Sequence, residues 1–214
     1  MKPWFHHCKF HFSNKEFLSS VFMAVFLLVA SLLINWYAGT YATEKASNAV
    51  TDIILSNIAP RDVDVVYVYG PIVFWLFIAF LCFKDLHKLP FTFKSIALFV
   101  AIRSVFVSLT HIGPFPSQIP IESDLISWFA FSGDLFFSGH TGLAFLMALV
   151  FWDNRFLRIL FIGVSILFGV VVLLAHLHYS IDVLSAFFIT YTIYHMARVF
   201  FKKDEQIFQK GLAA

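Results

Sequence analysis

The stretch FLSSVFMAVFLLVASLLINWYA, residues Phe17 to Ala38, contains no Lys, Arg, Asp or Glu and decides the class of the protein. As a helix with a rise of about 1.5 Å per residue, it is long enough to cross the hydrocarbon layer of a bilayer. The whole chain has the same character, because 60% of its 214 residues are hydrophobic, 13% are charged and the mean hydropathy is +0.82. This composition excludes an ordinary soluble domain and predicts an integral membrane protein.

Five further charge-poor stretches follow the first. They are Val65–Phe83, Ser95–Ile112 (interrupted by Arg103), Leu135–Trp152, Ile159–Ala175 and Val183–Ala197. Helices are expected because a backbone exposed to lipid must satisfy its own hydrogen bonds, and these stretches lack the two-residue alternation of barrel strands. The sequence predicts an all-α integral membrane bundle of six transmembrane helices. We expect a single domain over residues 1–214, with cytoplasmic tails at 1–16 and 202–214.

The distribution of Lys and Arg predicts the orientation. Twelve of these residues lie in the two termini and in the 84–94 and 153–158 loops, whereas the opposite side has only Lys45 and Arg61. Positive residues concentrate on the cytoplasmic side of membrane proteins. We therefore expect both termini in the cytoplasm, and the loops after the first, third and fifth spans on the non-cytoplasmic face. The chain has no Asn-x-Ser/Thr acceptor, which fits the periplasmic side of a bacterial inner membrane.

Other features exclude several classes of function. The net charge of +2 comes with no basic stripe interleaved with aromatics, so no nucleic-acid partner is expected. Cys8 and Cys82 are the only cysteines, and they predict no disulfide framework. The N-terminus lacks a small-residue cleavage site, so we expect the first span to be retained. In the first outer loop, the apolar residues between Val50 and Ile58 predict either a short helix on the membrane or a polar connection.

Ionisable residues gather at the outer ends of the predicted spans. They are His111, His140, His176, His178, Glu122, Asp124, Asp134 and Asp182. Ionisable groups at membrane depth are costly and usually mark function. The sequence therefore predicts a functional site on the outer face.

The first part of this site is Ser138-Gly139-His140, at the outer start of the fourth span. Ser138 can cap the helix, and Gly139 leaves the backbone amides open to a ligand. A helix N-terminus binds anions through its free N–H groups and its dipole. His140 is then positioned to pass a proton to or from an oxygen of the bound group. The alternative is an ordinary capped helix start with an interfacial histidine.

The second part is His176-Leu177-His178-Tyr179-Ser180-Ile181-Asp182, which joins the fifth and sixth spans. His178 and Asp182 are four residues apart and share one face once the helix begins. If Asp182 accepts a hydrogen bond from one ring nitrogen of His178, the other nitrogen is free to act as a nucleophile. In one alternative, His178 and Asp182 only satisfy each other's hydrogen bonds at a helix start and have no catalytic role. In another, His140, His176, His178 and Asp182 bind a metal such as zinc.

Arg103 is the third part, because a guanidinium inside the third span requires an anion. The phosphate of a bound lipid, which Arg recognises bidentately, is one candidate. A protein carboxylate such as Asp182 is the other.

These motifs resemble those of the type-2 phosphatidic acid phosphatase superfamily, and more closely those of its sphingomyelin synthase-like branch. Residues 132–141 (SGDLFFSGHT) resemble the Cys-Gly-Asp-x-x-x-Ser-Gly-His-Thr motif of that branch, with Ser132 in place of Cys. Residues 175–183 (AHLHYSIDV) resemble its Ala-His-Asp-His-Tyr-Thr-x-Asp-Val motif, with Leu177 in place of Asp. Arg103 resembles the arginine of its third span, which is followed by a proline comparable to Pro114.

The resemblance implies a six-span fold and a catalytic triad of His140, His178 and Asp182, with no metal or organic cofactor. His178 would attack the phosphorus of a phospholipid head group, while His140 protonates the departing diacylglycerol. We also expect four residues to bind the substrate phosphate, namely Arg103, Ser138, Gly139 and His176.

The leading hypothesis is a lipid phosphotransferase that moves a phospho-head-group from a phospholipid to a lipid alcohol such as ceramide. A lipid phosphatase or a phospholipase C-like hydrolase with water as acceptor is the alternative, and a transporter or scaffold is a third. Val172 stands where the phosphatases usually carry an arginine, and Phe137 replaces their proline, which favours the synthase branch. The proline-rich motif of the synthases' first outer loop is not recognisable around Ile58–Asp64, so the acceptor stays open.

Overall fold

The computed structural model describes residue 11 and residues 13–119 and 135–212. Its helices are α2 (Lys15–Lys45), α3 (Asp64–Lys84), α4 (Leu89–Leu109), α5 (Gly139–Val150), α6 (Arg155–Leu174), α7 (Ser180–Phe200) and α8 (Lys202–Lys210). Two short 3₁₀ turns, η1 (Leu55–Asn57) and η2 (Leu86–Lys88), complete the regular structure, and the described ranges contain no strand. The predicted all-α membrane bundle is confirmed.

The six predicted spans all correspond to helices, but the fourth is shorter than expected. Within the described residues, five helices are long and apolar enough to cross a membrane, namely α2, α3, α4 with its preceding turn, α6 and α7. By contrast, α5 has 12 residues, or roughly 18 Å at 1.5 Å per residue. It replaces the predicted Leu135–Trp152 span because the backbone before Gly139 is used in contacts with the start of α7, described below.

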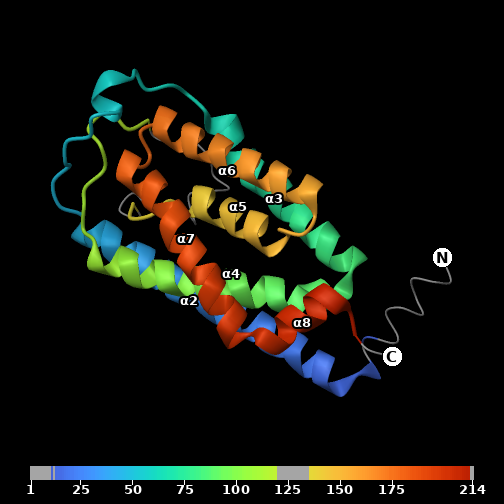
Figure 1. The fold of residues 1–214 in the computed structure, drawn as a ribbon. Helices are drawn as coiled ribbons and strands as arrows, with labels where there is room; N and C mark the ends of the chain where they lie inside the picture. The colour runs from blue at the N-terminus through green and yellow to red at the C-terminus, as the bar shows by residue number, and fades with distance from the viewer. Residues whose placement is uncertain (1–10, 12, 120–134, 213–214) are drawn as a thin grey trace.

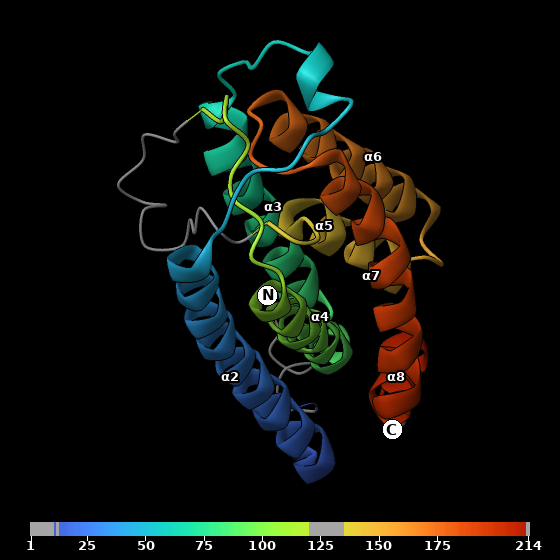
Figure 2. The ribbon, with the colours of Figure 1, turned by 90° about the vertical axis from the view of Figure 1, so that its left-hand side faces the viewer.

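The short helix α5 lies in the middle of the bundle, surrounded by α3, α4, α6 and α7 (Figures 1 and 2). Most of its residues are buried, and Leu146 and Met147 are fully enclosed in the main apolar core. Gly142 allows close packing, because a Cβ there would lie 2.7 Å from the ring of Phe99 on α4. Protein therefore surrounds α5, so this helix does not need the length of a lipid-facing span.

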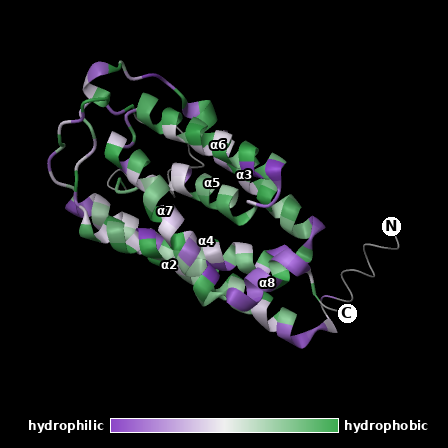
Figure 3. Cartoon of the chain, in the orientation of Figure 1, coloured by the Kyte–Doolittle hydropathy of each residue, from purple (hydrophilic) through white to green (hydrophobic). Residues whose placement is uncertain are grey.

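Helix α2 lies on the outside of the bundle and packs along α4 (Figure 2). It exposes large apolar side chains such as Phe22, Phe26 and Leu33. Hydrophilic residues gather at the helix ends, in the loops and on α8 (Figure 3). An apolar outer surface with polar ends is the pattern expected for a bundle in lipid.

Successive helices run in opposite directions and give the bundle two distinct ends. One end, here called the site end, holds the starts of α5 and α7 and the 46–63 loop (Figure 1). The other, here called the basic end, holds the starts of α2, α4 and α6 together with α8. Of the Lys- and Arg-rich segments in the sequence, the parts that the structure describes lie at the basic end, namely Lys15, the 84–94 and 153–158 loops and residues 198–210.

Two connections differ from the expectations. The 46–63 loop does not form the short membrane helix that was one of its two expected forms, since its only regular element is the η1 turn. Instead, it folds inward and buries Leu55 against Leu135 and Tyr179. The expected C-terminal tail contains a helix, α8, whose Asp204 forms a buried ion pair with Lys94 of α4 at 2.7 Å.

Candidate active site

Ser138 caps the start of α5, as the sequence predicts. Its Oγ accepts a hydrogen bond from the backbone N–H of Thr141 at 3.4 Å, and the hydroxyl of Thr141 donates to the same oxygen. The side chain is fully buried. This capping fixes where the helix begins and aligns its first N–H groups at the site end.

Arg103 lies directly against the start of α5. Its Nε donates a hydrogen bond to the carbonyl of Phe137 at 3.0 Å, and the side chain is buried. A Cβ at residue 139 would lie 3.2 Å from this Nε and 3.4 Å from Cζ, so Gly139 lets the guanidinium lie a few tenths of an ångström closer than another residue would. The guanidinium and the α5 N-terminus thus bring positive charge to one place, and the Nε hydrogen bond goes to a backbone carbonyl and not to Asp182.

His178 and Asp182 meet at the start of α7, with Nδ1 of the histidine 3.6 Å from Oδ2 of the carboxylate. However, the expected hydrogen bond between them is replaced by one from Nδ1 to the carbonyl of Leu135, at 2.8 Å. The same Oδ2 of Asp182 accepts from the backbone N–H of Tyr179 at 2.8 Å, in a capping box. Because a carbonyl can only accept, Nδ1 carries a proton, and in the neutral ring the lone pair is therefore on Nε2.

The carboxylate of Asp182 is completely buried, and its second oxygen, Oδ1, has no hydrogen-bond partner. An unsatisfied buried carboxylate oxygen is costly in a folded protein. A positive charge that develops on the ring of His178 would reduce this cost. Asp182 is therefore suited to stabilise an imidazolium, even though it does not set the tautomer of His178.

Backbone contacts join the starts of α5 and α7. The N–H of Ser138 donates to the carbonyl of Asp182 at 3.1 Å, and the carbonyl of Leu135 receives the ring N–H of His178. These contacts hold the two motifs side by side although they are about forty residues apart in the chain. They also explain why α5 does not extend back to Leu135, since that backbone is already paired with α7.

His140 is the second residue of α5 and is partly exposed. Its ring stacks on that of Tyr67 from α3, with centroids 4.5 Å apart and planes inclined by 25°. The edge of Phe168 from α6 contacts the same ring at 6.0 Å between centroids. The two aromatic residues restrict the orientation of the imidazole at the start of α5.

His176 occupies a more constrained position than expected. Its φ angle is 57°, a left-handed conformation that is uncommon outside glycine, at the turn between α6 and α7. The ring is buried, hydrogen-bonds through Nδ1 with the hydroxyl of Ser117 at 2.7 Å, and packs edge-on against Phe115. Its Nε2 is buried without a hydrogen-bond partner. In this structure His176 thus anchors the 113–119 segment to the turn that presents His178.

Asp52 is a site-end residue that the sequence reasoning missed. One of its oxygens accepts from both the N–H and the hydroxyl of Ser180, at 2.7 and 2.8 Å. The other accepts from the N–H groups of Ile54 and Leu55. Burial alone would raise the pKa of this carboxyl, but the hydrogen bonds from Leu55, Ser180 and Ile54 outweigh it and hold the pKa below its ordinary value.

Tyr179 provides a second contact between the outer loops and α7. Its hydroxyl donates to the carbonyl of Gly113 at 2.8 Å and accepts from the N–H of Val50 at 3.2 Å. The ring is almost fully buried, and this burial raises the pKa of its phenol, so that the hydroxyl remains a donor. The position of Tyr179 between the two proposed catalytic residues was the one sequence signal for its importance. Its partners, Gly113 and Val50, are distant in the chain and were not predictable.

Some predicted residues cannot be placed. Ser132, Gly133, Asp134, Glu122 and Asp124 lie outside the described residues. His111 is described, and its ring contacts the carbonyl of Ser108 and the ring of Tyr41. Among the residues that the structure describes, no group of three His, Cys, Asp or Glu side chains could hold a metal ion, so nothing supports the alternative of a zinc site.

The fold and the site together describe a membrane-embedded helical protein with two histidines and a buried carboxylate at neighbouring helix starts, and with an arginine of α4 against one of these starts. Residues 132–199 match the family model of the PAP2 superfamily C-terminal domain. This match includes both motifs and supports the type-2 phosphatidic acid phosphatase superfamily, and with it an enzyme of the lipid phosphatase or phosphotransferase type. No curated protein and no solved structure matches the chain.

Proposed function

We propose that the protein transfers a phospho-head-group from a phospholipid to a lipid alcohol through a phosphohistidine on His178. The observation that carries this proposal is the hydrogen bond from Nδ1 of His178 to the carbonyl of Leu135, with Asp182 at 3.6 Å. It leaves Nε2 as the nucleophilic nitrogen and places a carboxylate next to a ring that gains positive charge when it bonds to phosphorus.

In the first step, Nε2 of His178 attacks the phosphorus, and the bond from phosphorus to the diacylglycerol oxygen breaks. His140 donates a proton to that oxygen, so diacylglycerol leaves as a neutral alcohol. In the second step, His140 takes the proton from the hydroxyl of the acceptor. The acceptor oxygen then attacks the phosphohistidine and releases His178 in its starting form.

Two groups are proposed to stabilise the phosphorus-bound oxygens during both steps. Arg103 supplies a guanidinium beside Gly139, and the start of α5, capped by Ser138, supplies N–H groups and the positive end of the helix dipole. We also propose His176 as a residue that supports this region from the turn before α7. Its contact with Ser117 suits a positioning role.

The charge of the site favours a phosphodiester substrate. Arg103 is the only buried arginine within the described residues, and Val172, buried on α6, occupies the position where the phosphatases usually carry another. A phosphomonoester at neutral pH carries close to two negative charges, whereas a phosphodiester carries one, so a single guanidinium suits the diester. The single buried arginine thus favours a sphingomyelin synthase-like transferase over a phosphatase.

The Lys and Arg distribution supports a site on the non-cytoplasmic face, because the site end is opposite the basic end. We propose the outer leaflet as the source of the substrates, and both lipids as the partners of the reaction.

The test is to incubate purified protein in lipid nanodiscs with a phospholipid labelled in its head group, with and without ceramide. We expect the label to move to ceramide, and this transfer to be absent in His178→Ala. Release of a water-soluble labelled product that is indifferent to ceramide would identify a hydrolase instead. Full activity of the His178→Ala variant in either reaction would refute the proposed nucleophile.

A further inference from the structure

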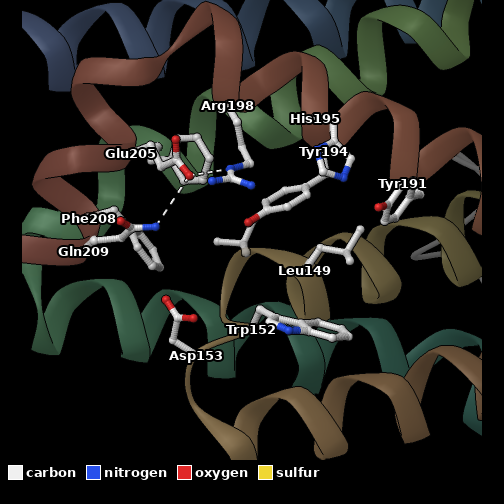
Figure 4. A pocket seen from close by; sticks show the side chains of 12 residues that line it. Leu149, Trp152, Asp153, Tyr191, Tyr194, His195, Arg198, Glu205, Phe208 and Gln209 are labelled. Atoms are coloured by element: carbon white, nitrogen blue, oxygen red, sulfur yellow. Dashed lines mark hydrogen bonds and ion pairs between the residues drawn. The ribbon is translucent and has the colours of Figure 1, made fainter.

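A cavity lies at the basic end, away from the proposed catalytic groups. It has a volume of about 330 Å³ and is formed by α4, α5, α7, α8 and the turn that follows α5. This size is at the lower limit of small-molecule binding sites. Figure 4 shows the carboxylate of Asp153 and the hydroxyl of Tyr194 pointing into the same opening, with Arg198 and Glu205 beside it.

The charges in this basic-end cavity do not balance. Arg198 is already paired, because its Nε lies 2.5 Å from Oε1 of Glu205. Asp153 is exposed and has no ion pair among the described residues, and its carboxylate acts electrostatically on both Tyr194 and Arg198. With two carboxylates and one guanidinium in its lining, the cavity carries one net negative charge when His195 is neutral.

The rest of the lining is rich in aromatic rings, since five Phe, Tyr and Trp side chains contribute to it. Two of these rings already attract cations in the folded protein. The guanidinium of Arg158 lies 4.8 Å from the centroid of Trp152, and that of Arg198 lies 5.8 Å from the centroid of Tyr194. Aromatic faces combined with a free carboxylate are the surroundings in which ammonium groups bind.

We propose that the basic-end cavity binds an organic cation, a primary or quaternary ammonium group. An anion would meet Asp153 and Glu205, Arg198 is already neutralised by Glu205, and Arg158 lies outside the lining, over the ring of Trp152. A metal ion is disfavoured, because no three His, Cys, Asp or Glu side chains in the described part of the chain converge to hold one. The ammonium group can belong to a phospholipid head group of the adjacent leaflet or to a soluble amine.

The experiment uses the full-length protein in phosphatidylglycerol nanodiscs, with choline as the probe and ligand-observed NMR titration as the readout. Its neutral carbon analogue, 3,3-dimethylbutan-1-ol, tests whether the charge is needed. Asp153→Asn removes the free carboxylate, and Glu16→Gln removes an exposed carboxylate at the same end, outside the lining. Tyr194→Leu removes an aromatic face that Tyr194→Phe keeps.

We expect saturable binding of choline and none of the neutral analogue. Affinity should fall roughly fivefold in Asp153→Asn, because an exposed ion pair contributes about this much to binding. It should stay unchanged in Glu16→Gln. Tyr194→Phe should bind normally and Tyr194→Leu weakly. Equal binding by wild type and Asp153→Asn, equal binding of the neutral analogue, or tighter binding of inorganic phosphate would each overturn the proposal.

The lipid of the nanodisc distinguishes the two sources of the ammonium group. If choline binds more weakly in phosphatidylcholine than in phosphatidylglycerol nanodiscs, the lipid head group competes for the cavity and is its occupant. If the affinities are equal, the occupant is a soluble amine, and both results support the site. Because the titration requires no turnover, it is independent of the transferase proposal. Repeating it with His178→Ala should give the same affinity.

Discussion

The two ends of the bundle treat buried ionisable groups in opposite ways. At the site end, Oδ1 of Asp182 and Nε2 of His176 are buried without hydrogen-bond partners. At the basic end, the buried charges of Lys94 and Asp204 are 2.7 Å apart, and the hydroxyl of Ser20 bonds to both. Unsatisfied polar groups cost stability and persist where function requires them, whereas satisfied networks fix structure. The comparison predicts that substitutions at the site end mainly reduce activity, and that those at the basic end mainly reduce stability.

The largest effect on activity among the variants considered below is expected for Asp182→Asn. The amide can still accept from the N–H of Tyr179, so the helix cap remains, but the negative charge beside His178 is lost. We expect transferase activity to fall on the order of 10³-fold. Stability should stay equal or rise, because an unsatisfied buried charge has been removed. Head-group transfer and thermal unfolding in nanodiscs measure the two quantities.

The informative control for this variant is Asp182→Ala, which removes both the charge and the cap. It should lose activity to the same extent and lose stability as well. If Asp182→Asn kept its activity and only the alanine variant were impaired, Asp182 would be a capping residue without a catalytic role, and the contrast between the two ends would fail.

Lys94→Met should have the opposite profile. It leaves the buried carboxylate of Asp204 without its cation, and we expect the free energy of unfolding to fall by roughly 3 kcal/mol. Head-group transfer measured well below the unfolding temperature should be unchanged. The double substitution Lys94→Met with Asp204→Leu removes both charges and should recover most of the stability. A loss of activity in folded Lys94→Met would show that the two ends are coupled.

The outcome for the helices shows what hydropathy can predict. All six charge-poor stretches form helices, because each must satisfy its backbone within lipid or within the bundle. The fourth charge-poor stretch begins four residues before α5, because Leu135 and Ser138 form hydrogen bonds with distant partners, His178 and Asp182, and the start of the helix was indicated by the Ser138 cap instead. Hydropathy contains no information about such contacts. It also does not reveal that α5 is enclosed by protein and therefore does not need to span the bilayer.

In the candidate site, too, local contacts were predictable from the sequence, whereas contacts between distant residues were not. The contact between His178 and Asp182 follows from their spacing of four residues, and the Ser138 cap follows from residue type. The carbonyl that sets the tautomer of His178 is a backbone group, so the side chain of Leu135 gives no sequence signal for this contact. Asp52 is 128 residues away from Ser180 in the chain, so only the folded structure brings them together.

A smaller effect at the site end is expected for Gly139→Ala. The new Cβ would lie 3.2 Å from Nε of Arg103, so the guanidinium must move by a few tenths of an ångström. We expect roughly a tenfold loss in kcat with little change in stability, because small displacements of charge-stabilising groups are costly in the transition state. The matched control is Gly163→Ala on α6, where a Cβ has open space, and this variant should retain full activity.

The smallest effect is expected for Asp52→Asn, and it depends on pH. Because hydrogen bonds hold the pKa of Asp52 below its ordinary value of 3.8, the ionised carboxylate stabilises the fold above that value. This contribution is lost as pH falls through the lowered pKa of the folded state. At pH 7 we expect Asp52→Asn to cost about 1 kcal/mol in the free energy of unfolding, through weaker hydrogen bonds to Ser180.

The difference between the variant and wild type should shrink as pH falls below 3.8, whereas for Asp62→Asn, an exposed residue of the same loop, it should be near zero throughout. A difference that grew on acidification would show that Asp52 does not hold the start of α7 as an anion.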